Sequence, residues 1–327
     1  MSVSRRAPSP QAPLDAMRHA FAQAPLVGIG EVHWCARSLD FIIEMIGAPE
    51  FDGCCDDIVV EFGNARHQTL IDRYVAGESV DERTLCRVWR DTLHFMLWSP
   101  TVYARFFSRL REINRRRPAS RRLRVILAEE AFDWQGLTFD AWQRLHLRRD
   151  DHYCTVIERE VLARQRRALL VFGSTHLLKR GQPGMISPNG PAVPLGAQLT
   201  VRHDDALRVI WPYFCAKGDF LTSTERDCWP IPSLAWLAGS ELAERDFVPP
   251  FAPRQATGVK AGYLFDGCLY LGPLERRVEI PAPVVEDDAW LDEIAQRLAI
   301  LGGAQRERIE SLLPRAARER IRRRAVR

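Results

Sequence analysis

The stretch PLVGIGEVHWC, residues 25–35, decides the fold because it joins a buried strand to two ionisable side chains. Its apolar run predicts a strand over residues 25–33 that ends in Glu31 and His33. Residues two apart in an extended segment point to the same side of it. We therefore expect this carboxylate and this imidazole to face one common space at the end of the strand.

Three further apolar runs predict strands over residues 56–63, 122–130 and 167–176. Amphipathic helical patterns lie before and between these strands. They cover residues 14–23, 36–47, 64–77, 81–97, 100–116 and 150–166. Continuously apolar strands that alternate with helices are typical of a parallel sheet covered on both faces. The sequence therefore predicts an α/β fold with a mainly parallel central sheet and helices on both faces.

The pattern changes after residue 180. AQLTVRH (197–203) and ALRVIWPYF (206–214) are expected as strands, which are open to antiparallel hairpin pairing at the edge of the sheet. Residues 216–260 are rich in proline, glycine and tryptophan and give no clear assignment. Residues 261–273 predict a further strand or strand pair, and the chain is helical from residue 287.

The domain organisation follows from these patterns. Residues 1–13 are polar and proline-rich and are expected to be disordered. Residues 14–285 are expected to form one large α/β domain, and residues 286–327 a C-terminal helical tail rich in arginine.

Composition and charge narrow the class of protein. The chain of 327 residues is 46% hydrophobic and 27% charged, with a net charge of only +4, which is typical of a soluble globular protein. The terminal run RAARERIRRRAVR is interpreted as a solvated helix, so no nucleic-acid partner is expected. No segment reaches the roughly 18 apolar residues of a membrane span, so no membrane partner is expected either.

The eight cysteines show no CxxC pair and no zinc-ligand spacing, and most lie in apolar runs. This usage favours a reducing compartment, and we expect the protein to be cytoplasmic. The N-terminus has no apolar region typical of a secretory signal. The sequence does not define an oligomeric state.

Polar side chains gather where the predicted strands end, which is the edge of a parallel sheet where ligands bind. Burying several carboxylates together is costly unless cations, a metal or shared protons compensate. Their coincidence at one edge therefore predicts a functional site. The side chains concerned are Glu31, His33, Glu61, Glu129, Glu130, Asp133 and His176.

Structural roles are the alternative for each of these residues. Either histidine can be a hydrogen-bonded structural residue, and Glu61 can form an ion pair with Arg66. Glu129 and Glu130 are better explained as the start of a loop or a helix cap. No GxGxxG, GxSxG or HExxH motif is present, and Cys35 is disfavoured as a nucleophile.

The tetrads GEVH (30–33) and GSTH (173–176), with Glu61 at the end of a strand between them, resemble a known superfamily. It contains the erythromycin esterase-like, haem-binding uptake ChaN-like and Tiki/TraB proteins. RRDDHYCTVIE (148–158) resembles the Arg-Asp helix of that superfamily, which maps onto Arg149 and Asp150. The resemblance covers roughly residues 25–180 and implies a site made of these motifs.

The first functional hypothesis is a hydrolase that cleaves an ester or amide bond of a small molecule or peptide. His33, held by Glu31 or Glu61, takes a proton from water as the general base, and His176 or Arg66 stabilises the oxyanion. Arg66, Arg149 and Asp150 are expected to bind substrate. Asp150 is equally open to orienting an imidazole or capping its helix.

Three alternatives stay open at this stage. If the reaction is metal-assisted, one divalent metal, zinc, manganese or iron, is expected to lie between His33, His176 and Glu61. Glu31 and Asp150 are open as alternative or additional carboxylate ligands. A haem-binding protein without catalysis is possible with His33, His176 or Tyr153 as the axial ligand. The third is a tailoring enzyme that modifies a peptide or small molecule in a biosynthetic pathway.

Overall fold

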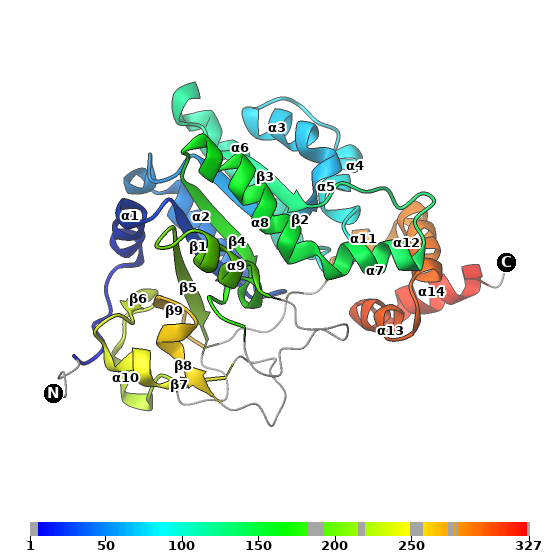
Figure 1. The fold of residues 1–327 in the computed structure, drawn as a ribbon. Helices are drawn as coiled ribbons and strands as arrows, with labels where there is room; N and C mark the ends of the chain where they lie inside the picture. Colours follow the sequence, from blue (N-terminus) through cyan, green and yellow to red (C-terminus); the bar gives the residue numbers. More distant parts are fainter. Residues whose placement is uncertain are drawn as a thin grey trace.

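The computed structural model describes residues 6–181, 193–214, 220–248, 258–273, 278 and 280–325. These residues form a seven-stranded sheet with the order β3-β2-β4-β1-β5-β9-β6, in which β6 alone runs antiparallel to its neighbour (Figure 1). The predicted α/β class with a mainly parallel sheet is confirmed. The strands are β1 (Leu26–Glu31), β2 (Asp57–Asn64), β3 (Arg124–Glu129), β4 (Ala168–Gly173), β5 (Leu207–Tyr213), β6 (Ser233–Trp236) and β9 (Gly267–Tyr270).

Helices cover both faces of the sheet, because alternate residues of each strand point to opposite sides. In β1, Val27 and Ile29 pack against the first helical layer, whereas Leu26 belongs to the core of the other face. The first layer contains α1 (Pro13–Gln23), α2 (Ala36–Gly47), α3 (Gln68–Ala76) and α6 (Thr101–Arg116). The second contains α8 (Arg149–Glu160) and α9 (Leu195–Arg202), which cross the front of the sheet in Figure 1.

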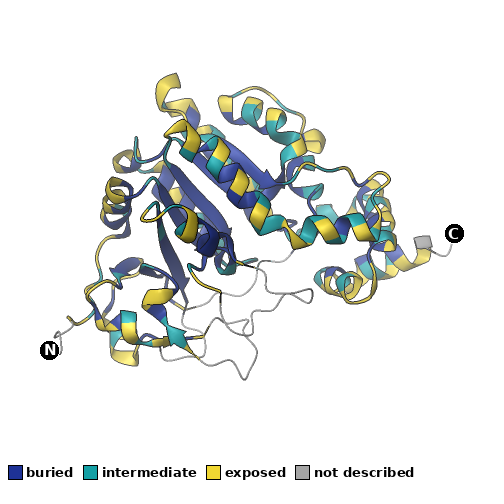
Figure 2. Ribbon diagram, viewed as in Figure 1, coloured by how far each residue is buried: buried dark blue, intermediate teal, exposed yellow. Residues whose placement is uncertain are grey.

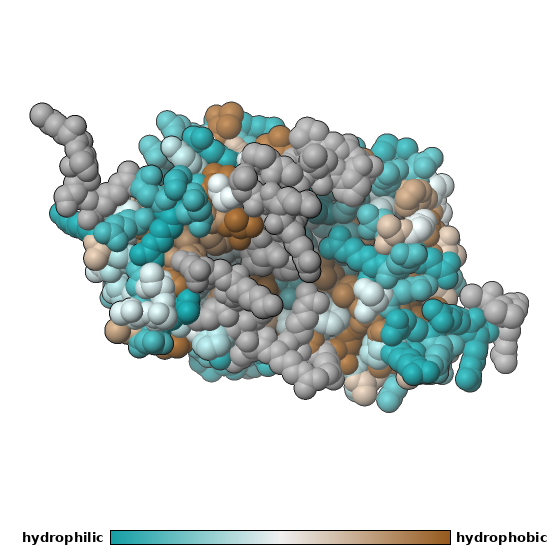
Figure 3. Space-filling model, turned by 90° about the horizontal axis from the view of Figure 1, so that it is seen from below, coloured by the Kyte–Doolittle hydropathy of each residue, from teal (hydrophilic) through white to brown (hydrophobic). Residues whose placement is uncertain are grey.

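The C-terminal helices form a third core together with α7 (Phe139–Leu147) and the loop that contains Leu93 and Phe95. They are α11 (Ala282–Glu286), α12 (Asp288–Ile300), α13 (Gly303–Leu312) and α14 (Arg315–Ala325). Ala317 and Ile321, four residues apart, place one face of α14 on this core, as helical spacing requires. Hydrophilic side chains gather at the C-terminal end of the molecule (Figure 3). The predicted C-terminal helical tail is confirmed, and it packs on this core, whereas the sequence was interpreted as a solvated helix.

The smaller elements complete the described chain. They are the short helices α4 (Glu82–Leu85), α5 (Arg87–Arg90) and α10 (Ser223–Cys228), and a two-stranded antiparallel sheet of β7 (Asp246–Phe247) and β8 (Val259–Lys260). The helix expected over residues 81–97 is therefore wrong in its extent, since only α4 and α5 are helical there. The sheet strands are buried almost throughout, in contrast to the helices (Figure 2).

The segment AQLTVRH was predicted as a strand, and this is wrong. Residues 195–202 form α9, in which Leu195 and Leu199 lie four apart and enter the same core. Gly196 lets this helix approach the backbone carbonyl of Leu177, where a Cβ atom would collide. A short apolar run fits either periodicity, and this packing decides for the helix.

The expected edge hairpin is also wrong, because β5 lies inside the sheet, parallel to both β1 and β9. The antiparallel edge strand is β6, which falls in the region that had no clear assignment. Of the strand or strand pair expected over 261–273, β9 forms only over Gly267–Tyr270.

The N-terminal prediction of disorder over 1–13 does not hold from residue 6 onward. Backbone hydrogen bonds join Arg6 to Gly239 and Gln11 to Leu234, next to the edge strand β6. These pairings use the backbone, which composition does not reveal. Residues 1–5 of that prediction lie outside the described residues.

Two features bear on the chain's surroundings. In the part of the chain that the structure describes, no helix combines the length and apolarity needed to cross a membrane. The described cysteines Cys35, Cys54, Cys55, Cys86, Cys154, Cys228 and Cys268 are free thiols.

Candidate functional site

The candidate site lies at the carboxyl ends of the three adjacent strands β2, β4 and β1. Glu31 ends β1 directly opposite Gly173 at the end of β4, and Glu61 lies in β2 on the other side of β4. His176 follows β4 in a short 3-10 helix over Ser174–Leu177. The strand order therefore brings the two glycine-led tetrads together although they are far apart in sequence.

Glu31 and His33 contact each other directly, through Oε1 of Glu31 and Nδ1 of His33. The strand ends at Glu31 rather than at the expected residue 33, so a turn and not extended backbone positions the imidazole. Tyr103 Oη donates a hydrogen bond of 3.4 Å to the same carboxylate oxygen. The other oxygen, Oε2 of Glu31, is buried with no hydrogen-bond partner.

His33 is the exposed member of this pair, with 28% of its side chain accessible against 1% for Glu31. Its ring meets Trp98 edge to face, with the ring centroids 5.0 Å apart. Burial of the ring disfavours its charged form, but the Glu31 carboxylate and the more distant Glu61 outweigh this and raise the pKa of His33 above its ordinary value. When the ring is neutral and Nδ1 donates to Glu31, the lone pair on Nε2 is available to accept a proton.

A second chain of contacts runs from Glu61 through His176 to Asp150. Nε2 of His176 lies 3.3 Å from Oε1 of Glu61, and Nδ1 lies 2.7 Å from Oδ1 of Asp150. Because both ring nitrogens face carboxylates, the arrangement favours the doubly protonated ring. Burial lowers the pKa of His176, but Asp150 and Glu61 outweigh it and raise this pKa to about 9.

The two carboxylates of this chain are fixed by further donors. Glu61 accepts a 2.6 Å hydrogen bond from the backbone N–H of Gly173, and Asp150 accepts one of 2.9 Å from that of Leu195. Burial raises the pKa of Glu61, but the imidazolium of His176 and the other donors lower it far below its ordinary range. Both ring nitrogens of His176 therefore face carboxylates, and this pairing favours the protonated ring.

Gly173 holds the two halves of the site together. A Cβ atom at this position would lie 2.8 Å from Cε1 and 3.1 Å from Nε2 of His33, and 3.1 Å from Oε2 of Glu61. Nε2 of His33 and Oε2 of Glu61 thus both border the space that a Cβ on this glycine would fill. The site is compact because this residue has no side chain.

Replacing Gly173 by alanine is expected to lower kcat by roughly tenfold, because the added methyl group displaces the His33 ring from its contact with Glu31. The backbone φ of −49° suits alanine, so the effect is steric. Turnover of Gly173→Ala and Gly47→Ala is to be compared, since a Cβ at Gly47 makes only an ordinary contact of 3.5 Å with Ile113. Full turnover in Gly173→Ala would contradict this geometry.

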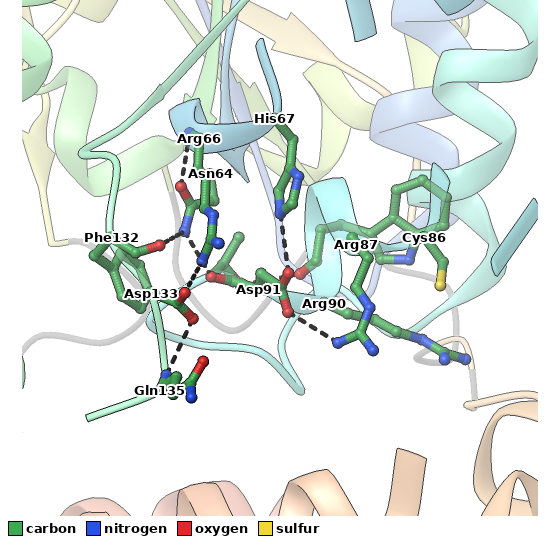
Figure 4. A network of polar contacts seen from close by, with 12 residues as sticks. Asn64, Arg66, His67, Cys86, Arg87, Arg90, Asp91, Phe132, Asp133 and Gln135 are labelled. Atoms are coloured by element: carbon green, nitrogen blue, oxygen red, sulfur yellow. Dashed lines mark hydrogen bonds and ion pairs between the residues drawn. The ribbon is translucent and has the colours of Figure 1, made fainter. Parts of the chain in front are cut away.

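Arg66 does not lie in this cluster. Its guanidinium forms an ion pair with Asp133, and both side chains are about half exposed (Figure 4). Asn64 makes the local turn by accepting a hydrogen bond from the backbone N–H of Arg66. Neither the ion pair with Glu61 that served as the structural alternative nor a role of Arg66 at the oxyanion fits this position.

The remaining acidic residues at the end of β3 have structural partners. Glu129 is buried and accepts hydrogen bonds of 3.0 and 3.1 Å from the backbone N–H of Leu93, while burial raises its pKa well above the ordinary value. Glu130 pairs with Arg148 at the surface. Tyr153, the haem-ligand candidate, is buried in the core beside His176, with the ring centroids 5.8 Å apart.

The predicted metal ligands His33, His176 and Glu61 have other partners in this structure. His176 presents no free lone pair, since both of its nitrogens lie at hydrogen-bond distance from carboxylates. Among the residues that the structure describes, no three His, Cys, Asp or Glu side chains are grouped as metal ligands. The same protonation disfavours His176 as an axial haem ligand, and the metal and haem hypotheses stay predictions.

Three cationic or imidazole side chains near the site were not anticipated. His94, in the loop before α6, and His146, at the end of α7, lie 3.1 Å apart through Nε2 and Nδ1. Arg308 lies on α13 of the C-terminal tail. The helical spacing of His146 and Arg149 was the one available signal, and α7 itself had not been predicted.

This chain is similar to known proteins in its fold and not in its sequence. No family model matches this chain, and a search of curated proteins finds no match either. Solved structures do match. An erythromycin esterase, a mutant of EreC in its open conformation, aligns with a TM-score of 0.54 and 13% identity over 81% of this chain and 94% of its own.

Two other structures align equally well. A Bacillus cereus protein has a TM-score of 0.55 and 10% identity over 84% of this chain and 97% of its own. A succinoglycan biosynthesis protein has a TM-score of 0.55 and 10% identity over 81% of this chain and 92% of its own. At such identities the likeness shows the fold alone, so this chain has an erythromycin esterase-like, hydrolase-like fold. The kinship to ChaN-like and Tiki/TraB proteins stays a prediction.

Proposed function

We propose that this chain is a hydrolase that cleaves an ester or amide bond of a small molecule or peptide, with His33 as the general base. The observation that carries the proposal is the contact of His33 Nδ1 with the buried carboxylate of Glu31, which leaves Nε2 free on a ring that keeps 28% of its surface. A carboxylate that orients one imidazole nitrogen prepares the other to accept a proton.

The reaction follows from this arrangement. Nε2 of His33 takes a proton from water while the water oxygen attacks the carbonyl carbon, which forms a tetrahedral oxyanion. The oxyanion then expels the alcohol or amine, which receives the same proton from His33. Both ring nitrogens of His176 face carboxylates, so this residue has no free N–H for the oxyanion. The hydrolase-like fold shared with an erythromycin esterase supports this reaction class.

Hydrolysis by the purified protein is the test of the proposal. A panel of neutral and charged esters and amides is to be assayed with and without a chelator. We expect turnover of at least one ester that persists in the chelator, since no step uses a metal. If turnover is lost in the chelator and restored by zinc, manganese or iron, the reaction is metal-assisted. This result would contradict a mechanism in which His33 alone activates the water.

The Glu31→Gln variant is expected to move the acid limb of the kcat/KM profile to lower pH and to reduce the plateau. His33 acts only when neutral, so wild-type activity rises with pH through a pKa above the ordinary 6.5. The Glu31 carboxylate raises that pKa, and its removal lowers it. A pH-rate profile of both proteins checks this, and an unmoved limb would show that Glu31 does not hold the base.

A further inference from the structure

A cluster of cationic and imidazole side chains lies beside the proposed catalytic residues. NH1 of Arg149 lies 2.7 Å from Nδ1 of His146 and 3.3 Å from Nε2 of His94. Trp142 stacks on His146, with the ring centroids 5.0 Å apart and the planes inclined by 8°. Three side chains from α7, α8 and a loop therefore converge on one point.

The two imidazoles of this cluster are neutral. Burial, the mutual proximity of the rings and the charge of Arg149 lower the pKa of His94 well below its ordinary value. Burial and Arg149 also lower the pKa of His146, to about 3. A neutral imidazole keeps one N–H donor. Arg149 donates to Nδ1 of His146, so the N–H of that neutral ring is on Nε2. The cluster thus combines a permanent positive charge with neutral imidazoles, a set suited to an anion.

The charge of Arg149 is not consumed by a dedicated carboxylate. Asp150 approaches its Nε only to 3.9 Å and is already bound by His176 and by the N–H of Leu195. Nε of Arg149 is buried with no hydrogen-bond partner. This guanidinium therefore retains capacity to bind a ligand group.

Arg308, on α13, carries a second guanidinium whose charge acts on Arg149, His94 and His146. It precedes Ile309, which is buried in the same core cluster as Trp142 of α7. A Cβ on Gly302, the N-cap of α13, would lie 3.5 Å from the Phe139 ring, so α13 begins next to the helix that carries His146. Partial desolvation and repulsion from Arg149 lower the pKa of Arg308, and Glu61 raises it. Within the described ranges, the guanidinium of Arg308 has no carboxylate partner.

Arg297 of the same tail is an example of an arginine with a structural role, since its charge is paired with carboxylates. It is buried, and it pairs with Asp91 at 2.7 Å and with Glu293 at 3.0 Å. Two arginines that approach each other without such partners raise the free energy of the folded chain. An anion between Arg149 and Arg308 would relieve that repulsion.

We propose that Arg149, Arg308, His94 and His146 form an anion subsite that binds a carboxylate or phosphate group of the substrate. The subsite adjoins the catalytic residues, because Arg149 precedes the Asp150 that binds His176. As a statement about substrate, the inference rests on the proposed function and narrows it to hydrolysis of an anionic ester or amide. It also assigns the C-terminal tail a role in recognition.

Equilibrium binding tests the subsite without any turnover. Inorganic phosphate and succinate are to be titrated by calorimetry into the full chain at constant ionic strength, which separates the two anion classes. We expect the wild type to bind at least one of them, Arg308→Gln to weaken binding about tenfold or more, and Arg308→Lys to weaken it less. Arg306→Gln is the matched control, because Arg306 lies on the same helix and pairs only with Glu310 at the surface.

Equal binding by wild type and Arg308→Gln, or no binding of either anion, would overturn the subsite. Circular dichroism confirms that each variant is folded. Anion binding without hydrolysis of any substrate would leave the subsite intact and reject the hydrolase. Conversely, hydrolysis of neutral esters at the rate of their carboxylate-bearing counterparts, with the KM unchanged in Arg308→Gln, would leave the hydrolase intact and reject the subsite.

Discussion

Replacing His33 by asparagine is expected to lower kcat/KM for ester or amide hydrolysis by about 10²–10⁴-fold, the usual contribution of a positioned general base. Asparagine keeps a polar side chain next to Glu31 but cannot take a proton from water. Steady-state kinetics on any substrate that the wild type cleaves measures the effect. Since His33 is part-exposed, we expect the variant to fold normally.

His203→Asn is the control for this substitution. His203 also faces a single carboxylate, with Nε2 2.8 Å from Oε1 of Glu158, but it lies directly after α9 and is about one third exposed, away from the candidate site. Its variant is expected to retain wild-type kcat/KM. Unchanged turnover in His33→Asn, with His203→Asn also active, would remove His33 from the mechanism.

Replacing His176 by asparagine is expected to lower the free energy of unfolding by about 3–5 kcal/mol, the usual cost of removing one partner of a buried ion pair. The variant leaves Glu61 and Asp150 buried without the cation that compensates them. Urea denaturation of both proteins measures the difference. His203→Asn again serves as the control, because its exposed pair with Glu158 contributes less than about 1 kcal/mol.

The pH dependence of this stabilisation has a defined sign. The pKa of His176 is raised from 6.5 to about 9, so its contribution is complete below 6.5 and is lost as the pH rises through 9. The pKa of Glu61 is lowered, so its contribution is present above its ordinary 4.5 and is lost only in stronger acid. The stability difference between wild type and His176→Asn should therefore shrink above pH 9, and a constant difference would contradict the ion pair.

The sequence predicted the part of the fold that rests on periodicity. Continuous apolar runs that alternate with helical patterns are typical of a parallel sheet covered on both faces, and β1, β2, β3 and β4 coincide with these runs. The meeting of Glu31, Glu61 and His176 follows from that sheet, since parallel strands present their carboxyl ends at one edge. Periodicity does not define the order of the strands in the sheet. For this reason β5 was expected at the edge of the sheet, whereas it lies between β1 and β9.

The contacts that the sequence could not predict are those that depend on tertiary packing. The helical state of α9 depends on its packing against Leu177. Arg66 forms its ion pair with Asp133 and not with Glu61. His94, His146 and Arg308 come from three segments whose proximity only the fold defines. Side chains that belong to no short motif cannot be assigned to a site from the sequence. Their role is recognised only when the positions of the helices that carry them are known.

NMR of the histidine ring nitrogens measures whether His176 is protonated and His33 is neutral. The chain has only eight histidines, and the His33→Asn and His176→Asn variants assign two of them. Near neutral pH we expect both ring nitrogens of His176 to be protonated, and we expect the ring to titrate with a pKa of about 9. A neutral His176 that titrates near the ordinary 6.5 would contradict the paired arrangement of base and imidazolium on which the proposed hydrolase depends.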